Sequence, residues 1–275
     1  MVDTKQDVLK IEFENAPLVS VIMPTYNCAE YIIQSVHSVV AQTFTNWELI
    51  IVDDCSTDGT EEILKPILKS HLNIHYYQLP KNSGPAIART EAINCANGKY
   101  VAFLDSDDIW LPKKLEKQIA FMENTGALFS CTAYELMDER GKRLKVECIP
   151  PEKTDYKSCV YLSNPIGNLT VIYNQEALGN FSVPPIRKRN DFALWLQILK
   201  KEKYCYGMKE TLAVYRKGRK ESVSNKRLQS ARYHWQLYRE IEKMNIWDSV
   251  VAMICWAFVK GTGFGLNKHK IRQSR

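Results

Sequence analysis

The chain has 275 residues, of which 45% are hydrophobic and 25% charged, with 12 glycines and 11 prolines. This composition is typical of a globular protein with a substantial core, and it excludes collagen, low-complexity disorder and a coiled-coil rod. The net charge of +6 is uneven, because residues 1–200 carry 20 Lys and Arg against 25 Asp and Glu, whereas residues 201–275 carry 17 against 6. A C-terminal quarter with a net charge of +11 predicts a polyanionic partner: nucleic acid, an anionic membrane or a phosphorylated substrate.

The beginning of the chain and its cysteines predict a cytoplasmic protein. Residues 1–17 contain six charged side chains and no apolar signal-peptide core, so we expect an N-terminal arm there. No charge-free apolar run reaches the ~20 residues of a spanning helix. The eight cysteines include no C-x-x-C pair, and the five histidines show no metal spacing. Dispersed cysteines without a signal peptide are best explained as small apolar residues in a reducing compartment.

Short β-branched and aromatic runs alternate with helical patterns in the first 105 residues. The runs predict strands at 19–23, 48–52, 74–78 and 100–104. Helices are predicted at 30–42 and 60–70, and a third is expected to follow Ser83, as its cap, and to end at Asn97. Such alternation predicts right-handed βαβ units on a parallel sheet, with functional side chains beyond the carboxyl ends of the strands.

After residue 111 the pattern changes. We expect a helix at 113–124, a strand at 128–137, a return strand at 143–146 and a helix at 191–200. The segment 149–168 is poorly periodic and rich in Pro, Lys, Tyr and Ser, so it is expected to be a loop that covers the substrate.

Asp105 and Asp107 form a D-x-D pair directly after the fourth predicted strand. Such carboxylates suit Mg²⁺ or Mn²⁺, which would also hold the phosphates of a nucleotide. An isolated D-x-D is more often a solvated turn. Its position after this strand, together with Asp53 and Asp54 after the second one, favours a nucleotide site. The Asp54 carboxylate can accept the imide proton of uracil, and the Tyr26 ring offers a surface for base stacking.

Three segments in unbroken order carry a family resemblance over residues 18–125: VSVIMPTYN, ELIIVDDCSTDGT and NSGPAIARTEAINCANGKYVAFLDSDDIW. They resemble the nucleotide-sugar half of the family 2 glycosyltransferases, and RKRNDFALWLQILKK and LAVYRKGRKESVSNKR fit the second half. The best likeness is to bacterial enzymes that assemble capsule, teichuronic acid or lipopolysaccharide. The resemblance implies an α/β, GT-A type fold, with a Rossmann-like nucleotide-binding sheet flanked by helices. We expect a nucleotide-sugar-binding half (18–110), an acceptor-binding and catalytic half (111–225) and basic, apolar C-terminal helices (226–275).

The resemblance also implies roles for single residues. Asp107 would be the direct metal ligand, with Asp105 at the ribose or at a metal-bound water, and the metal would be Mn²⁺ or Mg²⁺. Arg89 would lie near the donor. The nucleotide-sugar site implied in this way comprises Pro24, Thr25, Tyr26, Asp54, Arg89, Asp105, Ser106 and Asp107.

Asp191 takes the place of the family's catalytic base, the second acid of a pair that opens a helix. Its neighbour is the uncharged Asn190, and Trp195 follows four residues later, as is usual. A carboxylate at a helix start, behind a run of basic residues, is also suited to accepting a proton on general grounds. The family's metal-binding His after a Tyr-Arg pair has no match here. Arg216 and Arg219 are candidates to hold the diphosphate or the phosphate of a lipid-linked acceptor, or they belong to a solvated basic loop.

These residues predict an inverting, metal-dependent glycosyltransferase that uses a nucleotide-diphosphate sugar, with UDP favoured, and a glycan or lipid-linked glycan acceptor. Two alternatives stay open. A nucleotidyltransferase would carry a Gly-rich basic loop after the first strand, where this chain has PTYN. A non-catalytic nucleotide-sugar-binding subunit is favoured only by Asn190. No nucleic-acid-binding module is recognised, so no nucleic acid partner is expected.

The C-terminal region predicts contact with a membrane surface. Residues 249–259 carry no charge, and Trp247, Val250, Ile254 and Phe258 contribute to a helix without a polar face. Such a helix packs in a core or lies in a membrane interface. Four further cations lie in the tail, at Lys268, Lys270, Arg272 and Arg275. We therefore expect peripheral attachment to the inner face of the plasma membrane, beside a lipid-linked acceptor.

Overall fold

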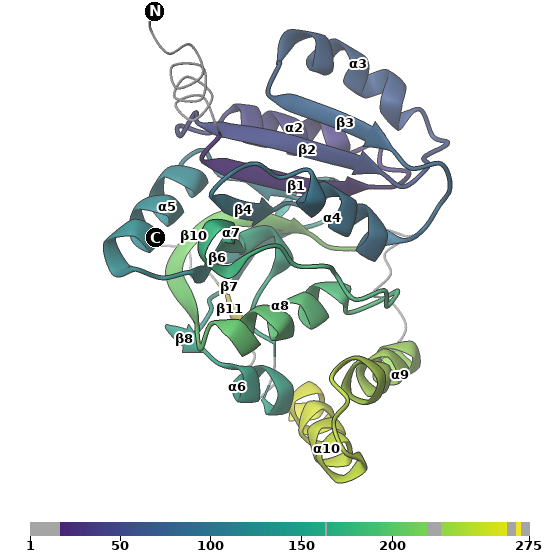
Figure 1. Ribbon diagram of the computed structural model, residues 1–275, viewed down its shortest axis with the longest axis vertical. Helices are drawn as coiled ribbons and strands as arrows, with labels where there is room; N and C mark the ends of the chain where they lie inside the picture. The colour runs from purple at the N-terminus through teal and green to yellow at the C-terminus, as the bar shows by residue number, and fades with distance from the viewer. Residues whose placement is uncertain (1–16, 163, 219–226, 263–267, 271–275) are drawn as a thin grey trace, which may run out of the picture.

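The computed structural model describes residues 17–162, 164–218, 227–262 and 268–270, and it shows a central sheet with helices on both faces (Figure 1). Within these ranges eleven strands join one sheet, whose main path is β11-β7-β6-β9-β4-β1-β2-β3. The α/β class predicted from the sequence is confirmed.

The first half is the parallel part of the sheet. Its strands are β1 (Val19–Thr25), β2 (Trp47–Asp53), β3 (Ile74–Gln78) and β4 (Tyr100–Phe103). Its helices are α2 (Ile32–Val40), α3 (Thr60–Ser70) and α4 (Pro85–Asn94). In register, Ile22 of β1 faces Ile50 of β2 on one side and Phe103 of β4 on the other. Because side chains alternate along a strand, Val21 and Met23 pack in one core with α2, and Ile22 packs in a second core with α4. All four predicted strands and the three helices are present, and the first and third helices are shorter than predicted.

The second half continues the sheet. Its first elements are β5 (Ile109–Trp110), α5 (Lys114–Thr125), β6 (Phe129–Met137) and β7 (Arg143–Cys148). Later come β9 (Ile172–Asn174), α7 (Gln175–Leu178), α8 (Asn190–Lys201) and β10 (Cys205–Arg216). Strand β9 runs antiparallel between β4 and β6, and β10 runs parallel to β6, so that Arg216 lies beside Met137. The helices at 113–124 and 191–200 and the strands at 128–137 and 143–146 are confirmed.

The expectation of a substrate-covering loop at 149–168 is wrong. The segment forms β8 (Lys153–Thr154), which pairs with β10, the helix α6 (Tyr156–Tyr161) and the start of a 3-10 turn, η1 (Asn168–Thr170). Asp155 caps α6 by accepting a hydrogen bond from the Ser158 N–H at 2.7 Å. Cys159 and Val160 are buried in the core that contains α8. A six-residue helix is too short to show a clear hydrophobic period, so only tertiary packing reveals it.

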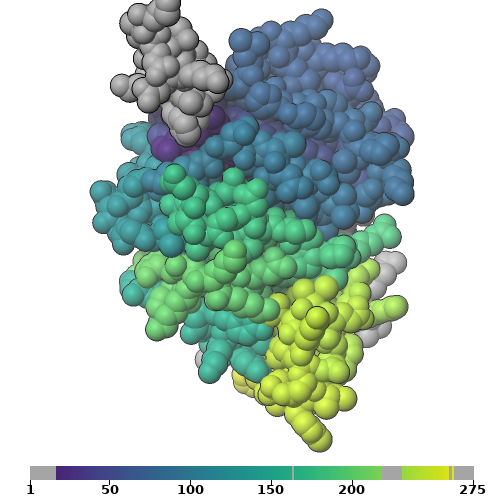
Figure 2. All heavy atoms as spheres, viewed as in Figure 1, coloured from purple at the N-terminus to yellow at the C-terminus, as the bar shows by residue number. Residues whose placement is uncertain are grey.

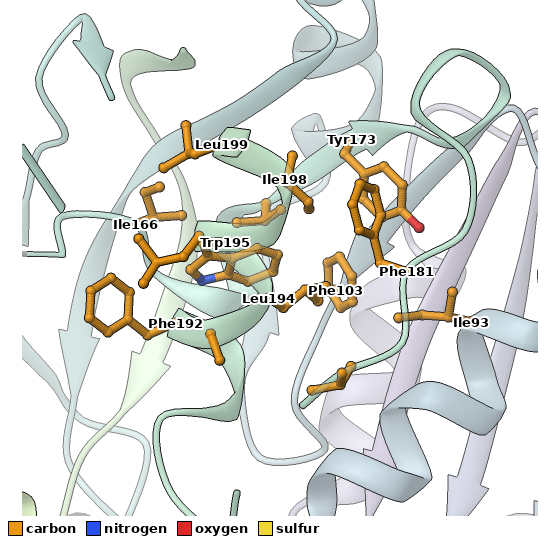
Figure 3. Packing of buried hydrophobic residues seen from close by; sticks show 14 of the residues in the cluster. Ile93, Phe103, Ile166, Tyr173, Phe181, Phe192, Leu194, Trp195, Ile198 and Leu199 are labelled. Atoms are coloured by element: carbon orange, nitrogen blue, oxygen red, sulfur yellow. The ribbon is translucent and has the colours of Figure 1, made fainter. Parts of the chain in front are cut away.

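Helix α8 is anchored through Trp195, which is fully buried (Figure 3). Its ring lies edge-on to Phe103 at 5.1 Å between centroids and 5.9 Å from Phe129. Phe103 is the last residue of β4, two positions before the D-x-D pair. The packing of Trp195 therefore fixes the start of α8 relative to the end of β4.

The C-terminal helices form a projection at the end of the molecule opposite α3 (Figures 1 and 2). They are α9 (Arg227–Gln236), a π-helical segment (Leu237–Ile241) and α10 (Ile246–Thr262), after which β11 (Lys268–Lys270) pairs with β7. Ala252 and Val259 of α10 are buried, whereas its opposite side exposes Ile246, Trp247, Val250, Val251, Ile254 and Phe258. We call these six residues the α10 apolar face. Helix α10 therefore packs on one side and exposes apolar side chains on the other.

Candidate active site

Polar loops after β1, β2 and β4 meet at one edge of the sheet, as the strand order predicts. The Thr25 carbonyl accepts a hydrogen bond from the Asp54 N–H at 2.8 Å, joining the ends of β1 and β2. The Asn27 side-chain oxygen accepts from the Thr57 N–H at 2.9 Å, which ties together the loops that follow these strands. Cys28 Sγ lies 3.3 Å from the Ser106 carbonyl, so the D-x-D loop is attached to the same cluster.

The residues expected to hold the nucleoside lie at the end of β1. Pro24 and Thr25 are buried, and the Thr25 hydroxyl has no hydrogen-bond partner among the described residues. Tyr26 is 47% exposed, so its ring is open to a ligand. The buried Thr25 hydroxyl and the open Tyr26 ring fit the predicted site for a base and its sugar.

Asp54 has a structural task that the sequence did not reveal. Its two carboxylate oxygens accept hydrogen bonds from the Ser83 and Gly84 N–H groups at 2.6 and 2.7 Å, at the N-terminus of α4. A negative charge is favourable at that helix end. The expectation that Ser83 caps the helix is wrong, because its hydroxyl donates to the Lys81 carbonyl. A hollow of about 280 Å³, lined by residues 82–87 and 185–187, lies beside this turn.

The D-x-D loop concentrates negative charge between β4 and β5. Asp105 and Asp107 are half-buried, and the adjacent Asp108 is 1% exposed. Asp108 Oδ1 accepts from the Arg216 N–H at 2.8 Å, while Oδ2 has no hydrogen-bond partner in the part of the chain described. Burial raises the pKa of Asp108 well above its usual range, and the charges of Asp107 and Asp105 raise it further. Asp108 belongs to the same DSDD run as Asp105 and Asp107 but was not among the residues predicted for the site.

This loop fits a divalent cation that arrives with a nucleotide. Within the described ranges, no three His, Cys, Asp or Glu side chains form a complete metal cage. Mg²⁺ needs only one or two carboxylates when phosphate oxygens and water complete its shell. The half-buried carboxylates of Asp105 and Asp107 and the unpartnered buried oxygen of Asp108 are oxygen donors of the kind that such a cation prefers. Asp105 also forms an ion pair with Arg89 at 2.9 Å.

The candidate base Asp191 lies near this loop. It is the second residue of α8, which follows the left-handed backbone of Arg189 (φ 66°), and its Oδ1 accepts from the Phe192 N–H at 2.8 Å. Burial raises the pKa of Tyr215, and the negative charges of Asp108, Asp107, Asp105 and Asp191 raise it further. Arg89 donates to Asp105 Oδ1 of the D-x-D loop and to Asn190 Oδ1, directly before Asp191, and these two hydrogen bonds place the start of α8 beside the loop.

Arg216 binds protein oxygens, although the sequence made it a candidate for diphosphate or acceptor contact. It is 3% exposed, and its Nε, Nη1 and Nη2 donate to the Asp107 carbonyl, the Glu139 carbonyl and Gln34 Oε1. Its guanidinium also lies 4.6 Å from the centre of the Tyr31 ring. Arg216 therefore fastens the D-x-D loop to α2, a contact for which the sequence carries no local signal. Arg219, the other candidate cation, lies outside the described residues.

Comparison with known proteins decides the family. The model of the family described as glycosyl transferase family 2 matches residues 20–176. A Bacillus subtilis protein named as a teichuronic acid biosynthesis glycosyltransferase, TuaG, is 45% identical over 244 residues, which cover 89% of this chain and 94% of that protein. The chain belongs to glycosyltransferase family 2.

Other members extend the comparison. The Escherichia coli protein WfgD, named as a UDP-Glc:α-D-GlcNAc-diphosphoundecaprenol β-1,3-glucosyltransferase, is 38% identical over 183 residues, 66% of this chain and 70% of that protein. Staphylococcus aureus TarS, solved with UDP-GlcNAc, superposes with a TM-score of 0.67 at 22% identity, over 90% of this chain and 73% of that one. A mannosyltransferase of Pyrobaculum calidifontis, solved with GDP-Man and Mn²⁺, superposes with a TM-score of 0.60 at 17% identity, over 90% and 76% of the two chains. These likenesses confirm the GT-A fold of this family 2 member.

Proposed function

We propose that this family 2 glycosyltransferase transfers a sugar from a UDP-sugar to an acceptor hydroxyl, with inversion, in the assembly of a surface polysaccharide. The observation that carries the proposal is the proximity of Asp191 to the D-x-D loop, which Arg89 joins to the start of α8. The names of TuaG and WfgD support polysaccharide assembly, and the UDP-GlcNAc bound to TarS supports the uridine nucleotide.

The donor would lie along the edge formed by the ends of β1, β2 and β4. Tyr26 would stack on the base, and the Asp54 carboxylate has lone pairs left to accept a base proton. Asp107 would hold the Mn²⁺ or Mg²⁺ ion, with Asp105 at the ribose or at a metal-bound water. That ion would supply charge neutralisation of the departing diphosphate.

Asp191 would remove the proton from the acceptor hydroxyl. The acceptor oxygen then forms a bond to the anomeric carbon as the bond to the diphosphate oxygen breaks on the opposite face. The nucleotide leaves as UDP, and the proton stays on Asp191 until it passes to water. A single displacement inverts the anomeric carbon, and it requires one carboxylate base and no carboxylate nucleophile.

The acceptor we propose is a sugar on a lipid diphosphate. WfgD, by its name, acts on GlcNAc linked to diphosphoundecaprenol. The closeness of the candidate base to the C-terminal helices, which carry the α10 apolar face, supports the same acceptor class. The centre of the His234 ring, in α9, lies 6.2 Å from the ring centre of Phe192, the residue after Asp191. It lies 4.7 Å from the ring centre of Trp256 in α10. Helix α10 is therefore separated from the start of α8 by one layer of rings.

A donor screen tests this function. The full chain is incubated with Mn²⁺, GlcNAc on a short-chain polyprenyl diphosphate, and UDP-Glc, UDP-GlcNAc or GDP-Man in turn. We expect release of UDP from at least one UDP-sugar and a β-linked product from the α-linked donor by NMR. Binding of UDP-sugars without turnover would favour a non-catalytic subunit, and formation of a nucleotide sugar from UTP and a sugar phosphate would favour a nucleotidyltransferase.

The α10 apolar face supports attachment to an anionic bilayer. No helix in the described ranges is long and apolar enough to cross a membrane. Trp247 is 78% exposed, Ile254 63% and Phe258 60%, on a helix that Lys243 precedes. Two copies meeting at this face would bring together two C-terminal quarters with a net charge of +11 each, whereas an anionic surface attracts them. We therefore propose that this face lies in the lipid headgroup region.

Three substitutions test the attachment. Trp247→Ser, Ile254→Ser and Phe258→Ser together should lower binding to phosphatidylglycerol-containing vesicles at least about tenfold, because a buried large apolar side chain contributes roughly 1.5–3 kcal/mol. The matched control replaces Ile63, Leu72 and Tyr77, which are exposed apolar residues at the other end of the molecule, by Ser. Unchanged co-sedimentation of the α10 variant, or a concentration-dependent dimer that this variant abolishes, would contradict the proposal.

A further inference from the structure

One guanidinium joins the two elements on which the proposed chemistry depends. Arg89, in α4, is 4% exposed. Its Nη2 pairs with Asp105 Oδ1 at 2.9 Å, and its Nη1 donates to Asn190 Oδ1. Asp105 belongs to the D-x-D loop, and Asn190 is the first residue of α8, directly before the candidate base Asp191. Arg89 thereby connects residues that are 85 positions apart in the chain.

The side chain of Asn190 forms a hydrogen bond with each of its two polar neighbours. It is 6% exposed, its Oδ1 accepts from Arg89, and its Nδ2 donates to the Ile186 carbonyl at 3.4 Å. An amide has both a donor and an acceptor end, whereas a carboxylate at this position would place an acceptor against the Ile186 carbonyl. The two contacts of the amide fix the direction in which Arg89 is held.

The neutrality of Asn190 also decides where the charge of Arg89 acts. Asp105 is the one carboxylate with which Arg89 forms an ion pair among the described residues. An acid at position 190 would compete for the same guanidinium and leave Asp105 less neutralised. Because Asp105 and Asp107 share one loop, a change at position 190 would alter the negative charge that a cation meets there.

We infer that Asn190 is a positioning residue, which acts through Arg89 to set the candidate base against the D-x-D loop and to keep the Arg89 charge on Asp105. This inference rests on the proposed function and adds to it. The amide of Asn190, at a position where the family usually has an acid, is then no sign that this chain has lost its activity. Asn190 instead orients α8 without placing a second carboxylate beside Asp191.

The test compares Asn190→Ala and Asn190→Asp with Asn174→Asp in the full chain. Asn174 is a matched control, since it is also buried (7% exposed) and caps α7 by accepting from the Ala177 N–H, a role that Asp also fills. Both Asn190 variants should lower kcat about 10- to 100-fold, the scale of a small misplacement of a catalytic group. The Kd for UDP should change less than about threefold, because the nucleoside contacts are untouched.

Mn²⁺ affinity gives a second readout that does not need turnover. Measured by calorimetry in the presence of UDP, binding of Mn²⁺ should be severalfold tighter in Asn190→Asp than in wild type, because Arg89 is then shared between two carboxylates. Asn190→Ala should bind Mn²⁺ no more tightly than Asn190→Asp, and Asn174→Asp should match wild type in every measurement.

Three outcomes would overturn the inference: wild-type kcat in Asn190→Ala, unchanged Mn²⁺ affinity in Asn190→Asp, or parallel losses of UDP affinity and thermal stability in both variants. The last outcome would show a purely structural role. If wild type itself transfers no sugar, the proposed function fails, and the Mn²⁺ measurements still decide whether Asn190 controls the charge of the D-x-D loop.

Discussion

Replacing Asp191 by Asn should lower kcat by about two to four orders of magnitude, the usual contribution of a positioned general base. The substitution keeps the size of the side chain and its Oδ1, which accepts from the Phe192 N–H. It removes the ability to take up a proton from the acceptor hydroxyl. The Kd for UDP, measured by calorimetry with Mn²⁺, should remain within about threefold of wild type, because the proposed role of Asp191 is toward the acceptor and not toward the nucleotide.

Asp155→Asn is the matched control for this variant. Asp155 also stands at a helix start, where it caps α6. Asn is an equally good cap, so the control should keep its full activity. If Asp191→Asn loses UDP affinity as strongly as kcat, Asp191 is structural, and the base has to be sought among other carboxylates such as Glu135 or Asp138.

Replacing Asp107 by Ala should abolish transfer and weaken binding of the UDP-sugar. The change removes the carboxylate we propose as the direct metal ligand, and stabilisation of diphosphate charge by a cation is worth several kcal/mol, or about a thousandfold in kcat/KM. Isothermal calorimetry should show that Mn²⁺ strengthens UDP binding to wild type and has little effect on the variant.

Removal of the metal supplies the control for Asp107→Ala. In EDTA, wild type should bind UDP as weakly as the variant does with Mn²⁺ present. Asp138→Ala, which alters a carboxylate in the exposed turn between β6 and β7, should respond to Mn²⁺ as wild type does. Full activity of wild type in EDTA would contradict the assignment of Asp107.

The sequence by itself determined the alternation of strands and helices and the position of the polar loops. Hydrophobic period and turn residues are local properties, so they predicted β1 to β4 and the helices between them. The connection rules for parallel strands then placed Tyr26, Asp54 and the D-x-D pair at one edge of the sheet. The hydrogen bond from the Asp54 N–H to the Thr25 carbonyl joins the first two of these loops, and the contact of Cys28 Sγ with the Ser106 carbonyl joins the D-x-D loop to them.

Only the tertiary structure decided what those side chains bind. Asp54 caps α4, and Arg216 fastens the D-x-D loop to α2. Arg89 reaches Asn190, which is 101 positions away. Each of these contacts depends on the packing of elements distant in the chain, and no local period records such a distance. The sequence also failed to predict the helix α6 and the side of α10 that packs against the protein. Burial depends on which neighbours a segment meets in the folded protein, and these neighbours are distant in the chain.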